Sequence, residues 1–161
     1  PGPTKRGERT RHDWRLGSLQ PAVVQVDDNH LIEYCRRGSG YGPRNDGYMI
    51  RAESHDGGKT WTEGIETKLP NPNAAIDFLK LQNGHLVLVY NDSMTKRTPL
   101  TVAISSDNDK TYAHRQDIAV GNFDYAYPYV IQTRDGKIHL VYTSHGRTVI
   151  NHAVFEESAI K

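Results

Sequence analysis

The sequence predicts an all-β protein built from blades of a β-propeller, and three observations support this prediction. The 161 residues carry short apolar runs that end in turn residues, and no long stretch has the 3.6-residue periodicity of an amphipathic helix. Asn-Gly and Asp-Gly pairs separate several of these runs, and such pairs are strong hairpin signals because both residues tolerate positive φ. Turn sequences recur about every 50 residues, a spacing typical of blades with about four strands.

The predicted strands form three similar units, each made of a hairpin and one further strand. The hairpin turns of the second and third units contain Gly84 and Gly136, an offset of 52 positions. The predicted strands are Ala22–Val26, Leu31–Cys35, Tyr48–Glu53, Ile76–Leu81, Leu86–Tyr90, Leu100–Ser105, Tyr129–Thr133, Ile138–Tyr142 and Val149–Phe155.

A second kind of turn follows the third strand of the first two units. It reads Ser54-His55-Asp56-Gly57-Gly58-Lys59-Thr60-Trp61 in one copy and Ser105-Ser106-Asp107-Asn108-Asp109-Lys110-Thr111-Tyr112 in the other. The first Asp of each copy can accept hydrogen bonds from the N–H groups of its own turn, and glycine supplies the unusual φ. We expect the aromatic residue to fill the space between blades. The residues predicted to have a structural role only are Ser54, Asp56, Gly58, Trp61, Ser105 and Asp107.

The composition excludes several classes of protein. Lys plus Arg is 20 and Asp plus Glu is 19, whereas a dedicated nucleic-acid-binding protein needs a basic surface. No run of about 18 apolar residues predicts a membrane span. The single Cys35 excludes an internal disulfide framework and a cysteine zinc cluster, and the spacing of the eight histidines indicates no metal site. We therefore expect no cofactor, no metal, no nucleic acid and no membrane partner.

The turn that begins at Ser54 resembles the Asp-box, or bacterial neuraminidase repeat, of sialidases. Three further stretches resemble bacterial predicted neuraminidases: Leu69–Asn73 followed by Ile76-Asp77, Arg97–Val102, and Tyr125–Pro128. The resemblance begins near Gly17. It implies a sialidase-type six-bladed β-propeller, of which this sequence supplies about three blades.

The expected organisation follows from this resemblance. Residues 1–17 are expected to be an N-terminal loop or fragment end, and residues 18–161 a partial β-propeller with blades at about 18–62, 71–113 and 124–156. A propeller needs at least four blades to close. The other blades are therefore expected from a missing N-terminal half, or alternatively from a homodimer of this chain.

The resemblance also implies a substrate-binding site with three arginines. Sialidases bind an anionic sugar, and the planar fork of arginine pairs both oxygens of a carboxylate. Arg36 takes the place of the second family arginine and Arg97 that of the third, while Arg37 competes with Arg36 for its place. The first family arginine is expected outside this sequence.

Tyr127 takes the place of the family's tyrosine nucleophile, and Tyr125 is expected on the same strand face as a substrate ligand. A neutral phenol suits an anionic substrate because a carboxylate nucleophile would be repelled. The sequence departs from the family at two positions. Gln20 stands where a glutamate would accept the phenol proton, and Thr143 stands where many sialidases have a carboxylate.

Asp77 is the candidate substitute carboxylate. It interrupts an apolar run, where a charge is costly unless it is paired or used. One interpretation makes Asp77 an acid/base catalyst or substrate ligand. The alternative is a half-buried polar residue that is hydrogen-bonded to the neighbouring blade.

These residues predict a sialidase-like, exo-acting glycoside hydrolase with a carbohydrate substrate that carries an acidic sugar. Two alternatives stay open: another carbohydrate-active propeller enzyme (a different glycosidase or a uronate lyase), and a non-catalytic propeller that binds glycans or protein. Convergence of Arg36 and Arg97 on one concave site favours an enzyme, and scattered arginines favour the non-catalytic protein. The resemblance alone suggests an extracellular or periplasmic location.

Overall fold

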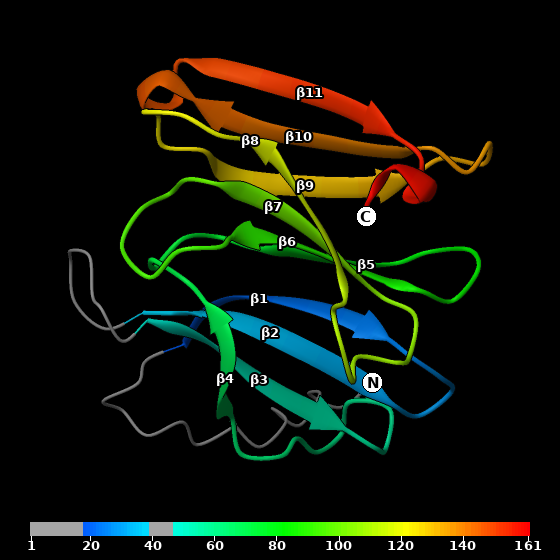
Figure 1. Ribbon diagram of the computed structural model, residues 1–161. Helices are drawn as coiled ribbons and strands as arrows, with labels where there is room; N and C mark the ends of the chain where they lie inside the picture. Colours follow the sequence, from blue (N-terminus) through cyan, green and yellow to red (C-terminus); the bar gives the residue numbers. More distant parts are fainter. Residues whose placement is uncertain (1–17, 39–46) are drawn as a thin grey trace, which may run out of the picture.

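A computed structural model describes residues 18–38 and 47–161 of the chain, and the predicted segment 1–17 lies outside the described residues (Figure 1). The described residues form three antiparallel sheets. The first sheet contains, in spatial order, β1 (Ser18–Gln25), β2 (Leu31–Arg37), β3 (Tyr48–Ser54) and β4 (Ile65–Pro70). The second contains β5 (Asp77–Lys80), β6 (Leu86–Asn91), β7 (Leu100–Ser105) and β8 (His114–Ala119). The third contains β9 (Ala126–Gln132), β10 (Ile138–Ser144) and β11 (Val149–Phe155), with the short 3₁₀ helices η1 (His145–Arg147) and η2 (Glu157–Ala159).

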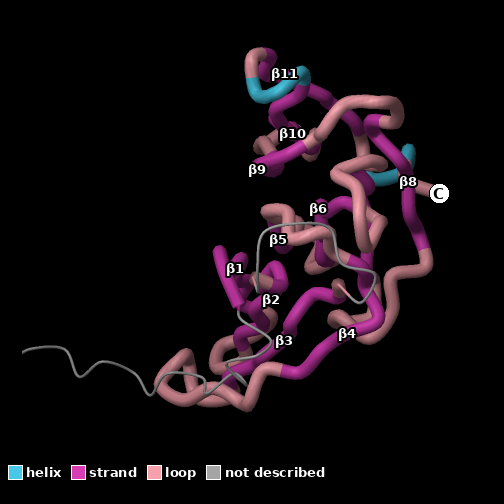
Figure 2. The backbone as a smooth tube through the Cα atoms, turned by 90° about the vertical axis from the view of Figure 1, so that its left-hand side faces the viewer, coloured by secondary structure: helices cyan, strands magenta, loops and turns pink. Residues whose placement is uncertain are grey.

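The all-β prediction is confirmed, and the three sheets are successive propeller blades. Figure 2 shows the innermost strands β1, β5 and β9 along one side of the molecule and the outer strands β4 and β8 on the other. The outer strands lie beyond the expected ends of the first two blades. Half of their residues are both solvent-exposed and polar, so the sequence has no apolar alternation there to indicate a strand.

The core of the molecule lies between the blades. One cluster joins the first and second sheets, and a second cluster joins the second and third sheets. Strands β6 and β7 contribute to both, and every one of their residues is buried. This position explains their continuous apolar sequence, because a strand covered on both faces has no polar side to present.

Both Asp-box turns have the predicted hydrogen bonds. Asp56 Oδ1 accepts from the N–H groups of Lys59 and Thr60 at 2.9 Å each, and its Oδ2 accepts from the Thr60 hydroxyl at 2.7 Å. The hydrogen bonds from Thr60 are the main reason why the pKa of Asp56 falls to about 2. Asp107 accepts the equivalent bonds in the second copy, with the Thr111 hydroxyl at 2.7 Å.

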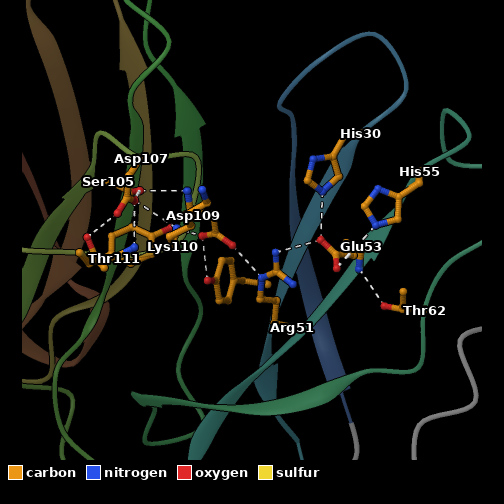
Figure 3. Close-up of polar contacts among 12 residues, drawn as sticks. His30, Arg51, Glu53, His55, Thr62, Ser105, Asp107, Asp109, Lys110 and Thr111 are labelled. Atoms are coloured by element: carbon orange, nitrogen blue, oxygen red, sulfur yellow. Dashed lines mark hydrogen bonds and ion pairs between the residues drawn. The ribbon is translucent and has the colours of Figure 1, made fainter.

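The second Asp-box also joins the first two blades through Asp109, which stands where the first copy has Gly58. The side chain of Asp109 is fully buried. Its carboxylate accepts a hydrogen bond from Arg51 Nε at 2.7 Å (Figure 3). It also accepts hydrogen bonds from the Tyr34 and Tyr112 hydroxyls at 2.9 and 2.6 Å. Tyr112 thus fills the space between blades as expected, whereas Trp61 of the first copy is only half-buried.

The first and third sheets each present apolar side chains to solvent. Ile150 on β11 is 77% exposed, and Tyr129 and Ile131 of β9 are exposed on the same sheet. Leu19 and Val23 on β1 are exposed on the first sheet. None of the helices in the described part of the chain is long and apolar enough to cross a membrane.

Candidate anion-binding site

The candidate site lies at the sheet edge where the innermost strands begin. In each blade a residue with positive φ lies near the start of the innermost strand: Gln20 at 50°, Asn73 at 57° and Tyr127 at 53°. Gln20 and Tyr127 lie near the starts of β1 and β9, and Asn73 precedes β5. A left-handed residue redirects the chain locally, and such conformations in non-glycine residues gather at functional sites.

Arg36 and Arg97 meet at this edge. Arg36 is near the end of β2, which runs toward this edge, and Arg97 precedes the start of β7. Arg36 Nη1 donates a hydrogen bond to the carbonyl oxygen of Asn73 at 3.1 Å, and Arg97 Nη2 donates to the same oxygen at 3.2 Å. Because they share one acceptor atom, the two guanidinium groups from different blades are direct neighbours.

A buried asparagine fixes the loop that carries Asn73. Asn71 is almost completely buried, and its side-chain amide donates to the Ala74 carbonyl at 2.9 Å and accepts from the Ala74 N–H at 3.0 Å. Its own N–H donates to the Gly47 carbonyl at 2.8 Å. A side chain at Gly47 would collide with the Asn71 carbonyl oxygen, because a Cβ there would lie 2.4 Å from it. These contacts explain the Leu69–Asn73 motif, which holds the shared acceptor in place.

The arginine pair places two positive charges side by side. In residues 18–38 and 47–161, no carboxylate forms an ion pair with Arg36 or Arg97. The Nε atom of Arg36 is buried and has no hydrogen-bond partner among the described residues. Burial, and next the charge of Arg97, lower the pKa of Arg36. A bound anion would offset the repulsion between the two guanidinium groups and would accept a hydrogen bond from Arg36 Nε.

Arg147 adds a third positive charge, which was not predicted from the sequence. Its guanidinium carbon lies 5.0 Å from the centre of the Tyr127 ring, within the range of a cation–π interaction. The charges of Arg147 and Arg97 both act on Arg36. Arg147 reaches this place because His145, Gly146 and Arg147 in η1 all have positive φ. Such a turn has no simple sequence pattern, because Gly146 is the one residue of the three whose type favours positive φ.

Tyr127 is exposed at the same edge, with 39% of its surface accessible. It lies near enough to Arg36 to influence the pKa of that guanidinium. The Thr143 hydroxyl donates to the Ala126 carbonyl at 3.0 Å and so fixes the backbone just before Tyr127. Thr143 therefore supports the tyrosine in this structure.

A cavity of about 460 Å³ opens beside Arg97 and Asn73. The loops before β7 and β9 line it, with Lys96, Thr98 and Phe123 among the lining residues. The Phe123 ring lies against His145 with the ring centres 3.8 Å apart. The cavity is thus lined by the cationic side chains of Lys96 and Arg97, the apolar ring of Phe123 and the carboxylate of Asp124.

Tyr125 and Arg37 lie elsewhere. Tyr125 is buried in the core, where its hydroxyl donates to the Val120 carbonyl at 3.1 Å. The positive φ of Tyr127 breaks the strand alternation, so the two tyrosines do not share an exposed face as we expected. The Tyr125 N–H donates to the Arg97 carbonyl at 2.8 Å, so Tyr125 supports the site through its backbone. Arg37 is buried and paired with Glu66 of β4 at 3.2 Å.

Asp77 joins the second blade to the third. Its Oδ2 accepts a hydrogen bond from the Val130 N–H at 2.6 Å, and its Oδ1 accepts from the Phe78 N–H at 3.0 Å. Burial raises its pKa. These contacts match the alternative interpretation, a half-buried polar residue bonded to the neighbouring blade, while a catalytic role for Asp77 stays a prediction.

The profile of the BNR repeat-like domain matches residues 3–140. The chain belongs to the BNR repeat-like domain family. No curated protein matches the sequence.

Solved structures of glycosidases are similar to this member of the family. The NanB sialidase of Streptococcus pneumoniae superposes with a TM-score of 0.73 and 15% identity, over 88% of this chain and 24% of that one. The intramolecular trans-sialidase of Ruminococcus gnavus gives 0.70 and 19%, over 91% and 34%. The GH93 α-L-arabinofuranosidase of Fusarium graminearum gives 0.63 and 16%, over 88% and 46%. The chain spans less than half of each of these structures, and at these identities the similarity shows a sialidase-type propeller fold.

Proposed function

We propose that this protein binds the carboxylate of an acidic sugar at the Arg36–Arg97 edge, as part of a sialidase-like, exo-acting glycoside hydrolase. The observation that carries the proposal is the convergence of two guanidinium groups from different blades on one oxygen atom, at 3.1 and 3.2 Å. Arg147 adds a further positive charge beside Tyr127. A carboxylate bound there would accept charge-assisted hydrogen bonds, each worth about 1.5–3 kcal/mol.

The similar structures support an anionic ligand. The NanB structure holds a substituted ethanesulfonate, and the Ruminococcus gnavus enzyme holds oseltamivir carboxylate. Both ligands carry an acidic group that a pair of arginines can bind. In this proposal Tyr127 lies next to the bound sugar, where a neutral phenol is not repelled by the carboxylate.

Gln20 favours a second candidate function. An amide cannot take the proton of a phenol, and Gln20 stands in the sequence where the resemblance implies a glutamate base. A propeller that binds acidic glycans without cleaving them uses the same arginines and needs no base. The two candidates share the anion site and differ in turnover.

The test uses the full-length protein and a matched panel of acidic and neutral glycosides. Arg97→Ala is expected to lower kcat/KM for acidic glycosides by roughly 10- to 150-fold, the equivalent of one charge-assisted hydrogen bond, and to leave neutral ones nearly unchanged. Arg134→Ala is the matched control, because Arg134 is an exposed arginine in the β9–β10 turn. Equal losses on both classes of substrate would contradict the carboxylate site. Binding of acidic glycans without turnover would favour the second candidate.

We also propose that further propeller blades cover the exposed apolar faces of the first and third sheets. Burial of side chains such as Val23 and Ile150 supplies the driving force, at about 25 cal/mol per Å² of apolar surface. A second copy of this chain is the alternative cover. Light scattering distinguishes them, since a stable dimer of the 161-residue chain indicates the second copy and a monomer argues against it.

A further inference from the structure

Three potential metal ligands meet at the sheet edge opposite the arginines. His30 lies in the β1–β2 turn, Glu53 on β3 and His55 in the first Asp-box turn (Figure 3). One ligand atom from each residue lies within 4.8 Å of the other two. The sequence spacing did not indicate this cluster, because 23 residues separate His30 from Glu53.

The distances suit a tetrahedral ion. His30 Nε2 lies 3.0 Å from Glu53 Oε2, and His55 Nε2 lies 3.6 Å from Glu53 Oε1. Zinc–ligand distances of about 2.0–2.2 Å at tetrahedral angles place neighbouring ligand atoms roughly 3.3–3.6 Å apart. The two observed separations end on different oxygens of Glu53 and lie close to this range, and one ligand atom of each residue lies within 4.8 Å of the other two. Side-chain rotations would therefore bring the three atoms around one ion.

The backbone holds the ligands in this arrangement. The Gly57 N–H donates to the Asn29 carbonyl at 2.9 Å, which binds the Asp-box turn to the β1–β2 turn. The His30 N–H donates to Asp27 Oδ1 at 2.9 Å. The Glu53 backbone exchanges hydrogen bonds with Thr62, through the Thr62 N–H at 2.8 Å and the Thr62 hydroxyl at 3.1 Å. Little backbone conformational entropy therefore remains to be lost when an ion binds.

The carboxylate of Glu53 supplies the negative charge of the cluster, and Asp109 offsets the nearby positive charge of Arg51. Arg51 Nη2 donates to Glu53 Oε2 at 3.1 Å and orients the carboxylate as an outer-shell partner does. The charge of Arg51 is offset by the fully buried Asp109 at 2.7 Å. Glu53 consequently keeps its charge for a ligand, with Oε1 directed at His55 (Figure 3).

We propose that His30, Glu53 and His55 form a zinc site. Two imidazole nitrogens and one carboxylate oxygen match zinc, whereas calcium and magnesium prefer all-oxygen ligands. His55 is 64% exposed, so the fourth position of the ion faces solvent. The bound ion links the β1–β2 turn to the Asp-box turn of the first blade.

This site is separate from the arginine edge. His30 immediately precedes β2 and Arg36 lies near its far end, six residues away, which is about 20 Å along an extended strand. The inference therefore goes beyond the proposed function and does not depend on it.

Isothermal titration calorimetry of the purified protein with zinc chloride tests the proposal. One zinc per chain is expected to bind with micromolar or tighter affinity, and melting temperature is expected to rise with zinc and not with calcium or magnesium. His30→Ala, His55→Ala and Glu53→Gln are each expected to weaken zinc binding at least tenfold. Exposed His55 can be changed with little effect on the metal-free melting temperature, so this variant separates binding from folding.

His139→Ala is the matched control. His139 and His152 form a second close histidine pair, with nitrogens 3.1 Å apart, but no carboxylate is grouped with them among the described residues. Zinc affinity is expected to be unchanged in this variant. Absence of zinc binding, loss of binding in His139→Ala, or retention of binding in His55→Ala would each overturn the assignment.

Discussion

Replacement of Arg51 by methionine tests the contact that joins the first two blades. Arg51 on β3 donates to Asp109 at 2.7 Å, and the Asp109 side chain is 0% exposed while that of Arg51 is 21% exposed. Arg51→Met preserves the aliphatic stem but leaves a buried carboxylate without its cation. The Tyr34 and Tyr112 hydroxyls, at 2.9 and 2.6 Å, continue to donate to it.

The magnitude follows from the burial of this pair. Removal of one partner of a buried ion pair costs about 3–5 kcal/mol, because the other charge is left uncompensated. The two remaining hydroxyl donors and the partial exposure of Arg51 reduce the expected loss below this range, to about 2–3 kcal/mol. For a chain of this size that corresponds to a fall in Tm of roughly 5–10 °C.

The double variant R51M/D109G supplies the decisive comparison. Asp109 has a φ of 71°, which glycine adopts without strain, and the first Asp-box has Gly58 at this position. Removal of the stranded charge is expected to make the double variant more stable than R51M alone, as measured by urea unfolding. Two results would refute the account of a buried blade-to-blade ion pair. One is a double variant whose loss of stability equals the sum of the losses in R51M and D109G, and the other is an R51M loss below about 0.5 kcal/mol.

Three further predictions concern the turns and the site. Hydrogen bonds from its turn hold the pKa of Asp56 at about 2, below the value of about 3.9 in the unfolded chain. The ionised carboxylate therefore stabilises the fold fully at neutral pH, and this stabilisation disappears as the pH falls from about 4 to about 2. Acid titration of Tm in Asp56→Asn is therefore expected to show a shallower fall than in the parent, and parallel curves would contradict this. Asn71→Ala is expected to lower Tm and to weaken binding of acidic sugars, because the buried amide holds the Asn73 carbonyl; unchanged sugar affinity would separate the loop from the site. Gln20→Glu is expected to raise kcat on acidic glycosides by supplying a proton acceptor, and unchanged kcat would show that this position is not the base site.

Most of the fold could be predicted from the sequence because the inner strands carry strong local signals. Turn pairs such as Asn83-Gly84 and apolar runs such as Leu86–Tyr90 indicate hairpins without tertiary information. The outer strands β4 and β8 were not predicted because they are exposed and polar, and pairing with β3 and β7 is what makes them strands. Only tertiary contacts define such segments.

The candidate site was predictable only in part. The resemblance indicated Arg36, Arg97 and Tyr127, and the structure places them at one edge. Arg147 could not be predicted, because three consecutive residues of positive φ bring it there. The His30–Glu53–His55 cluster depends on the contact between two turns that are distant in sequence.

Asp109 departs from the Asp-box motif, and this departure has a structural role. Its sequence position suggested only a degenerate Asp-box, with aspartate in place of glycine. The structure instead gives it three hydrogen bonds, including one to Arg51 and one to Tyr34 of the neighbouring blade. A non-glycine residue at positive φ has a conformational cost, and here these contacts offset it.

The affinity of the full-length protein for an acidic sugar and for its neutral methyl ester tests the central claim most directly. The two ligands share the same sugar, and the ester replaces the negative charge that the Arg36–Arg97 pair is proposed to bind by a small neutral group. Calorimetry is expected to give at least about tenfold tighter binding of the acid, with most of this preference lost in Arg97→Ala. Equal affinity for the acid and the ester in the parent protein would contradict the proposed anion site.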